Sequence, residues 1–168
     1  MKLLTVSVVV LGALVALAWV GYHLVLPRAF VSAGRGALGD ARLVQLTGTR
    51  SARSAQDWNG ATVEAGPEHK FVLVDVRIDA PADKVDFDDF QLVREKAARP
   101  GDERNVGNNA EEDYFFWAYL DDAGNQIAEA PATRPFPARL TFKVPKDARA
   151  GFLFYWGLYW GPIDLSAP

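Results

Sequence analysis

Alternating apolar and charged side chains between Lys70 and Asp79 constrain the fold of this 168-residue chain more than any other feature. A period of two with β-branched residues on one face is typical of a β-strand that is buried on one side. The two faces consist of Val72, Val74, Val76 and Ile78 on the apolar side and Asp75, Arg77 and Asp79 on the charged side. The sequence therefore predicts a strand here, with its apolar row in a core.

Further strands are expected on both sides of this one. Arg42–Thr47 has a weaker alternation that is out of strict phase, which indicates a bulge. Strands are also expected to begin at Phe90 and to run through Leu140, Phe142 and Val144. Asp121–Asn125 predicts a hairpin loop, in which Gly124 is free to take a positive φ. A single helical turn near Phe87–Phe90 interrupts this pattern. Short strands between turn signals predict an all-β fold, a two-sheet antiparallel sandwich.

The order of these segments resembles a known group of bacterial domains. A strand, an F-x-L strand, a D-x-G turn and an F-x-V-P strand follow one another in Phe71–Val76, Phe87–Leu92, Leu120–Asn125 and Leu140–Pro145. This succession is similar to the immunoglobulin-like domains of unknown function in bacterial membrane-anchored proteins and surface lipoproteins. The resemblance covers about Asp40–Leu165 and implies an immunoglobulin-like sandwich outside the cytoplasm, without catalytic residues. The chain departs from many members of the group because it has no lipid-bearing cysteine.

The N-terminal segment Leu3–Leu26 predicts one transmembrane helix, because a run of roughly 24 uncharged residues is long enough to span a bilayer. Trp19 and Tyr22 lie toward its far end, where aromatic rings favour the membrane interface. The alternative is a signal peptide cleaved after the small residues of Ala16–Ala18. Cleavage there would leave an apolar tail on the mature chain, which favours an uncleaved anchor. The expected organisation is an anchor or signal peptide in 1–27, a flexible spacer in 28–40 and a β-sandwich domain in 41–168.

Several functional classes are disfavoured by composition. The net charge of −3 argues against a nucleic-acid partner, which requires a clustered basic surface. The absence of cysteine removes disulfides, thiolate catalysis and Cys-ligated zinc. Only two histidines exist, His23 in the predicted anchor and His69 beside Glu68, and no sequence-local partner would make His69 a general base. We therefore expect a non-enzymatic protein with no catalytic residue, no metal site and no cofactor.

Two acidic groups leave one alternative open. Asp83, Asp86, Asp88 and Asp89 form the first group, and Glu111, Glu112 and Asp113 form the second. Calcium requires several oxygens that converge from a loop, and neither group has the spacing of a known calcium loop. Solvated loop charge is the simpler interpretation, with calcium binding as the alternative. The polar stretch Glu95–Glu112 is expected to be a long loop.

Aromatic residues in Tyr114–Tyr119 and Phe152–Trp160 are the strongest indication of function. Successive side chains of a strand point to opposite faces, so these strands cannot place every ring in one core layer. If Phe116 and Leu120 point inward, the neighbouring rings point outward and form an aromatic face, unless another part of the chain covers them. The expected binding face consists of Phe115, Trp117, Tyr119, Tyr155, Trp156 and Trp160.

The sequence-based function follows from these expectations. We expect an extracytoplasmic binding or scaffold module, held in the cell membrane by one span, that contacts an envelope protein through the aromatic face. The short N-terminal flank, with Lys2 before the apolar run, favours a cytoplasmic N-terminus and an exported domain. The alternative is a lectin-type module, in which the same rings stack on a glycan and the acidic loops hold calcium.

Overall fold

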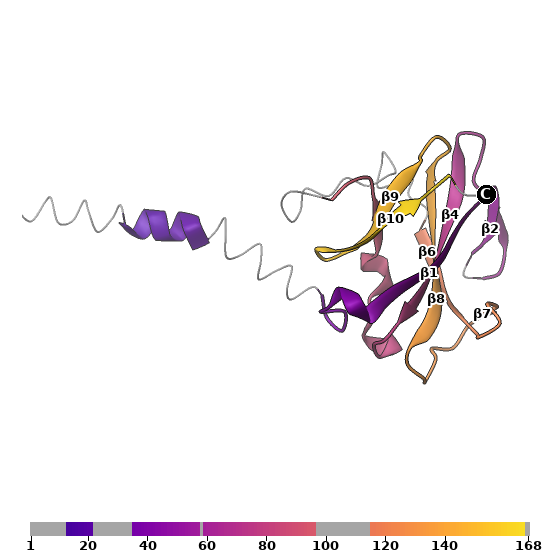
Figure 1. Ribbon diagram of the computed structural model, residues 1–168, viewed down its shortest axis with the longest axis horizontal. Coiled ribbons are helices and arrows are strands. Elements are labelled where there is room, and N and C mark those ends of the chain that lie inside the picture. The colour runs from indigo at the N-terminus through magenta and orange to yellow at the C-terminus, as the bar shows by residue number, and fades with distance from the viewer. Residues whose placement is uncertain (1–12, 22–34, 58, 97–114, 167–168) are drawn as a thin grey trace, which may run out of the picture. The chain divides into compact units, whose positions relative to one another are not determined.

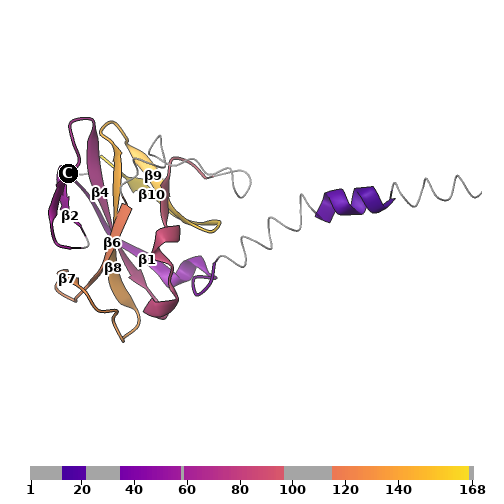
Figure 2. The same cartoon turned by 180° about the vertical axis from the view of Figure 1, so that it is seen from behind.

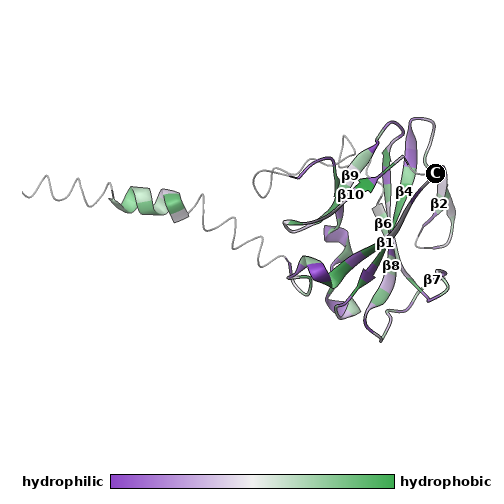
Figure 3. Cartoon of the chain, in the orientation of Figure 1, coloured by the Kyte–Doolittle hydropathy of each residue, from purple (hydrophilic) through white to green (hydrophobic). Residues whose placement is uncertain are grey.

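The structure, a computed structural model, describes residues 13–21, 35–57, 59–96 and 115–166. The chain divides into two compact units, Met1–Gly34 and Arg35–Pro168. In the first unit, residues 13–20 form an α-helix that is largely hydrophobic (Figure 3). Among the described residues, no helix has the length and apolar character needed to cross a bilayer. Most of the expected anchor Leu3–Leu26 lies outside the described residues.

The second unit is built from antiparallel strands and short 3₁₀-helices, which confirms the all-β prediction (Figures 1 and 2). The elements in chain order are η2 (Ala41–Leu43), β1 (Val44–Ala52), β2 (Ser54–Gln56), β3 (Thr62–Glu64), β4 (His69–Ile78), η3 (Ala82–Lys84), η4 (Phe87–Asp89), β5 (Gln91–Val93), β6 (Phe115–Leu120), β7 (Gln126–Ile127), β8 (Phe136–Pro145), β9 (Ala150–Tyr155) and β10 (Leu158–Asp164). The larger sheet has the order β1-β4-β8-β6-β7 and the smaller one β10-β9-β5, while β2 and β3 form a separate hairpin.

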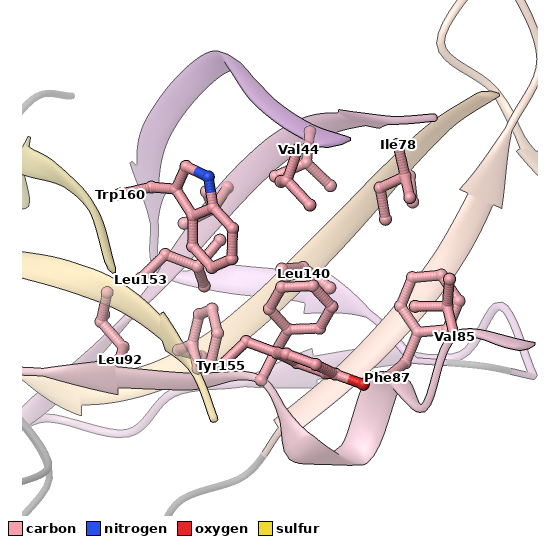
Figure 4. Packing of buried hydrophobic residues seen from close by; sticks show 14 of the residues in the cluster. Val44, Ile78, Val85, Phe87, Leu92, Leu140, Leu153, Tyr155 and Trp160 are labelled. Carbon is pink, nitrogen blue, oxygen red and sulfur yellow. The ribbon is translucent and has the colours of Figure 1, made fainter. Parts of the chain in front are cut away.

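The main core lies between the two sheets. Alternation along β4 places Val72, Val74 and Val76 in this core with no exposed surface, as predicted. The rows that face them include Leu153 and Tyr155 of β9, and Figure 4 shows side chains of the two sheets directed toward one another. Removing such apolar side chains from water contributes about 1.5–3 kcal/mol each, so this layer accounts for much of the stability of the sandwich.

A second, smaller core lies on the opposite face of the larger sheet. Phe71 and Leu73 of β4 and Phe116 of β6 are buried there beneath Ala55 and Ala65. The β2–β3 hairpin supplies this cover, and it lies on the side of the larger sheet away from β9 and β10 (Figures 1 and 2). The larger sheet therefore buries apolar side chains on both faces at this end, and the charged face of β4 is confined to its other end.

The compact unit starts before the boundary that the sequence indicated. Leu38 lies in the expected spacer 28–40, but its side chain is completely buried in the main core. Arg35 also belongs to this unit, since its Nε donates a hydrogen bond to the carbonyl of Trp156 at 3.0 Å. Residues 35–40 are therefore part of the folded unit, because a fully buried leucine fixes this stretch to the sandwich.

Local irregularities follow the turn and bulge signals of the sequence. The register between β1 and β4 shifts between Leu46 and Gly48, which confirms the expected bulge. Gly124 has a φ of 84°, as expected for the hairpin after β6. The expected loop Glu95–Glu112 falls mostly within residues 97–114, which lie outside the described residues.

Candidate functional site

The hairpin that joins β6 and β7 is held by its own turn residues. Asp121 donates its backbone N–H to the carbonyl of Asn125 at 2.9 Å and accepts the N–H of Gly124 at 3.0 Å. Its carboxylate also accepts the backbone and side-chain N–H groups of Asn125, at 2.8 and 3.0 Å. These hydrogen bonds lower the pKa of Asp121 because they favour its charged form. The turn is therefore closed by local hydrogen bonds that fix β7 against the end of β6.

Two of the expected site residues, Trp117 and Tyr119, lie on the core side of β6. The ring of Trp117 stacks on Phe87 with centroids 4.2 Å apart, and Tyr119 meets the edge of Phe87 at 5.6 Å. Tyr119 also packs edge-on against Phe136 at 5.8 Å, and burial raises its pKa. Both side chains are half-buried at the rim of the main core. The sequence led us to expect them on the outer face of β6 and Phe116 in the core. The orientation is reversed, because Phe116 is buried in the second core on the opposite face of the sheet.

An open groove of about 920 Å³ runs along β6. Gln56 and Gly60 of the β2–β3 hairpin line one side, and Gln126 and Ile127 line the other. Ala118 lies between these walls, opposite Arg139 of the neighbouring strand β8. The small side chain of Ala118 leaves space for a ligand in this part of the groove.

Arg139 in the groove is held by an ion pair with Asp75. Its Nε lies 2.6 Å from Asp75 Oδ1 and its Nη2 lies 3.0 Å from Oδ2. The two side chains expose only 12% and 27% of their surface, so the guanidinium is fixed in place and its charge is largely compensated. The groove is therefore nearly neutral at this point and does not select for a strongly charged ligand.

Ile127 gives the groove its apolar character. It is 37% exposed, which no other large hydrophobic side chain exceeds among the described residues of the second unit. With Trp117 and Tyr119 it gives apolar surface to a groove that Gln56, Asp88, Asn125 and Gln126 also line. Exposed aliphatic and aromatic groups beside polar ones are characteristic of binding surfaces.

The remaining expected site residues do not join this surface. Tyr155 is 1% exposed and packs on Phe90, with ring centroids 4.8 Å apart. Trp160 is 9% exposed and donates its indole N–H to the carbonyl of Ala41 at 2.8 Å. Their expected outward placement is therefore corrected, because these positions of β9 and β10 face the main core.

Trp156 lies at the turn between β9 and β10 and does not line the groove. It has a φ of 43° and is followed by Gly157 with a φ of 80°, the combination required by a two-residue type I′ turn. Its indole N–H donates to Asp89 Oδ2 at 2.6 Å, so its ring is tied to the domain. The side chain of Phe115 lies outside the described residues, and the six expected residues form no single face.

A different aromatic row lies on the outer face of the smaller sheet. Phe152 and Phe154 of β9 alternate with the residues that face the main core, and Tyr159 of β10 packs on the buried Phe154 with ring centroids 5.1 Å apart. The Nζ of Lys96 lies 5.3 Å from the ring centroid of Phe152, within the range of a cation–π interaction. β9 thus carries rings on both faces, but Phe154 is buried at 8% exposure, so this row is not the exposed aromatic face that the sequence led us to expect.

Two carboxylates of the first acidic group make structural hydrogen bonds, while Asp88 lines the groove. Asp86 caps η4 by accepting the N–H of Asp88 at 3.2 Å, and Asp89 accepts the indole of Trp156. Asp83 lies 3.4 Å from Lys84. Within the part of the chain that the structure describes, no three histidine or acidic side chains gather as metal ligands would. The second group, Glu111–Asp113, lies outside the described residues.

A second cleft of about 630 Å³ lies near the start of β4, between Arg53, Glu64, His69 and Lys146. Lys70 borders it, donates to the carbonyl of Ala148 at 2.8 Å and has a pKa lowered by burial. In the described part of the chain, no Phe, Tyr or Trp side chain lines this cleft, whereas three line the groove along β6.

Comparison of this chain with models of protein families, with curated proteins and with solved structures finds no match to it.

Proposed function

We propose that this protein is a non-enzymatic binding module that contacts a partner protein through the groove along β6. The observation that carries the proposal is the exposed Ile127 beside Trp117 and Tyr119, in the larger of the two grooves described above. Apolar and aromatic groups in a concave site, surrounded by amides, give a partner both contact area and hydrogen bonds. Of the six aromatic residues expected from the sequence, Trp117 and Tyr119 remain in the proposed site.

The module is proposed to be an immunoglobulin-like domain at the cell envelope. Its antiparallel sandwich is compatible with the resemblance to immunoglobulin-like domains of membrane-anchored bacterial proteins. The uncharged run Leu3–Leu26 supports an uncleaved single-span anchor, and Lys2 before this run supports export of the domain.

A protein partner is favoured over a glycan by the packing of Trp117. A sugar ring is usually bound by stacking on an open aromatic face, but one face of this indole is covered by Phe87 at 4.2 Å. The exposed aliphatic side chain of Ile127 suits a protein surface better than a polyol.

Substitution in the middle of the groove tests the proposed site. Ala118→Gln fills the groove with a neutral side chain, and Thr47→Gln introduces the same group at an exposed position of β1. We expect a protein that copurifies with the intact chain from its native membrane to be retained by Thr47→Gln and lost with Ala118→Gln. Equal retention by both folded variants would exclude the groove as the contact surface.

The anchor is tested separately. Intact mass spectrometry of the membrane-extracted protein should find a chain that retains Leu3–Leu26. A mature species that begins at Trp19 would contradict the anchor in favour of a signal peptide. Protease treatment of intact cells should degrade the sandwich, whereas protection until lysis would place the domain in the cytoplasm.

A further inference from the structure

The hydrogen-bond phase of β6 leaves part of its outer edge open. In an antiparallel ladder, every second residue bonds to the same neighbour. Asp121 bonds to Asn125 across the hairpin, on the side of β6 where β7 lies. The backbone groups of Tyr119 and Trp117, two and four residues before Asp121, therefore point to the same side. Tyr119 is paired there with Ile127. β7 ends at Ile127, and among the described residues none pairs with Trp117 on this edge.

The other strand edges of the sandwich carry features that prevent strand addition. β1 has a bulge and carries Arg50, while β10 has a register shift and contains Pro162. β5 and β7 are only three and two residues long. Bulges, charges, prolines and short lengths are the usual protection of a sheet edge.

β6 has none of these protective features. Its six residues Phe115–Leu120 contain no charge and no proline, and its register with β8 continues without a shift. An uncharged strand with an open edge and a regular register readily accepts a further strand. The same edge borders the groove of about 920 Å³, so there is room beside it.

We propose that the ligand of the groove is one extended peptide segment of a partner protein, which adds to β6 as an antiparallel strand. This inference rests on the proposed function, because it concerns the same groove. The segment would follow the line of β7 beyond Ile127, exchanging hydrogen bonds with the N–H and C=O of Trp117. Main-chain bonding of this kind provides affinity, while alternate side chains provide specificity.

Specificity would come from the two faces of the added strand. A residue directly opposite Trp117 would point to the side of Asp88, since paired residues share a face. Its neighbours would point into the open space above Ala118, between Gln56 and Gln126. The partner segment is thus expected to alternate, with small or amide side chains at every second position.

A second copy of the folded domain fits this edge less well than a peptide. The β6 strand of another copy would bring its own β7 hairpin with it, because β7 is fixed to Tyr119 and Leu120. Two such hairpins would compete for the one groove. A single strand has no such attachment and can lie between the β7 and β2–β3 hairpins.

Amide hydrogen exchange on the full-length chain tests whether the edge is open. The N–H of Ala118 points to β8, whereas that of Trp117 points to the groove. We expect Trp117 to exchange at least about tenfold faster than Ala118, as an amide without a hydrogen-bond partner does. Equal protection of the two amides without added ligand would overturn the inference, since the edge would already be paired.

Peptide binding tests the occupant. The probe is a peptide selected from a displayed library of random twelve-residue sequences for binding to the wild-type chain but not to Ala118→Gln. N-methylation of its successive residues should reduce affinity about tenfold at every second position and little between them, because only alternate amides bond to β6. Binding should also slow exchange at Trp117.

Three further results would overturn this inference. One is a loss of affinity that does not alternate along the N-methylated peptide. This would mean that the peptide is recognised by its side chains alone, and it would leave the proposed function intact. Another is a failure to select any peptide that distinguishes wild type from Ala118→Gln. The third is a doubling of molecular mass without peptide that Ala118→Gln abolishes, which would identify a second copy as the occupant.

Discussion

Trp117 illustrates how one residue can serve both the core and a binding surface. Its ring is half-buried against Phe87, while its backbone lies at the edge of the sheet and its side chain borders the groove. Removing the side chain therefore affects stability as well as any bound partner. The backbone contribution to binding, in contrast, is independent of which side chain is present.

Trp117→Ala is expected to destabilise the sandwich by about 2–3 kcal/mol, less than for a fully buried tryptophan because the ring is only partly covered. Trp117→Phe retains a stacked ring and should cost less than about 1.5 kcal/mol. Chemical denaturation monitored by circular dichroism measures both values. An unfolding midpoint of Trp117→Ala equal to that of wild type would contradict the stacking on Phe87.

At the scale of elements, strands with one apolar and one charged face were predictable, and those with two apolar faces were not. The inward side of β4 follows from Val74 and Arg77, which have opposite character. The sequence did not indicate which side chains of β6 face the main core, because Phe116 and Trp117 are both aromatic. Phe116 is buried in the second core beneath β2–β3, while Trp117 stacks on Phe87.

Short or unusual segments also escaped the sequence analysis. β2 and β3 are three residues each, too short for a detectable period. The turn between β9 and β10 uses Trp156 at a positive φ, a position where asparagine, aspartate or glycine is the usual signal. Neither the strand period nor the turn residues predicted the groove, because it is formed by hairpins that are far apart in the sequence. Only its Asp121–Asn125 turn and its aromatic strand were predictable.

The irregularity of β10 provides a test at this scale. Gly161 has a φ of 122°, and a Cβ added there would lie 2.9 Å from the backbone nitrogen of Ile163. Gly161→Ala should therefore lower stability by more than about 1 kcal/mol, because both strain and a backbone clash are introduced. Gly39→Ala, with no atom within 4 Å of the added Cβ, is the matched control and should change stability little. Similar melting temperatures for the two variants would show that the bulge adapts freely.

For the whole molecule, the main question is where the independent folding unit begins. Leu38 is completely buried and Arg35 bonds to the β9–β10 turn, so both belong to the sandwich. The unit Arg35–Pro168 thereby contains the sandwich core together with both walls of the groove.

Truncation tests this boundary. A chain of residues 35–168 should fold alone and melt as the sandwich does in the full-length protein. A chain of residues 41–168 loses Leu38 and should be less stable by about 2–3 kcal/mol, the value of one buried leucine. Circular dichroism during heating compares the two, and identical melting temperatures would place the boundary after residue 40.

Site-specific photocrosslinking in the native cells tests the central claim most directly, that the groove along β6 is the partner-binding surface. A photoreactive phenylalanine analogue replaces Ile127 in the groove or, as a control, exposed Thr47 on β1. The account predicts a discrete crosslinked protein from position 127, none from position 47, and loss of the crosslink when Ala118→Gln is added. The same crosslinked protein at both positions, or one that persists with Ala118→Gln, would contradict the account.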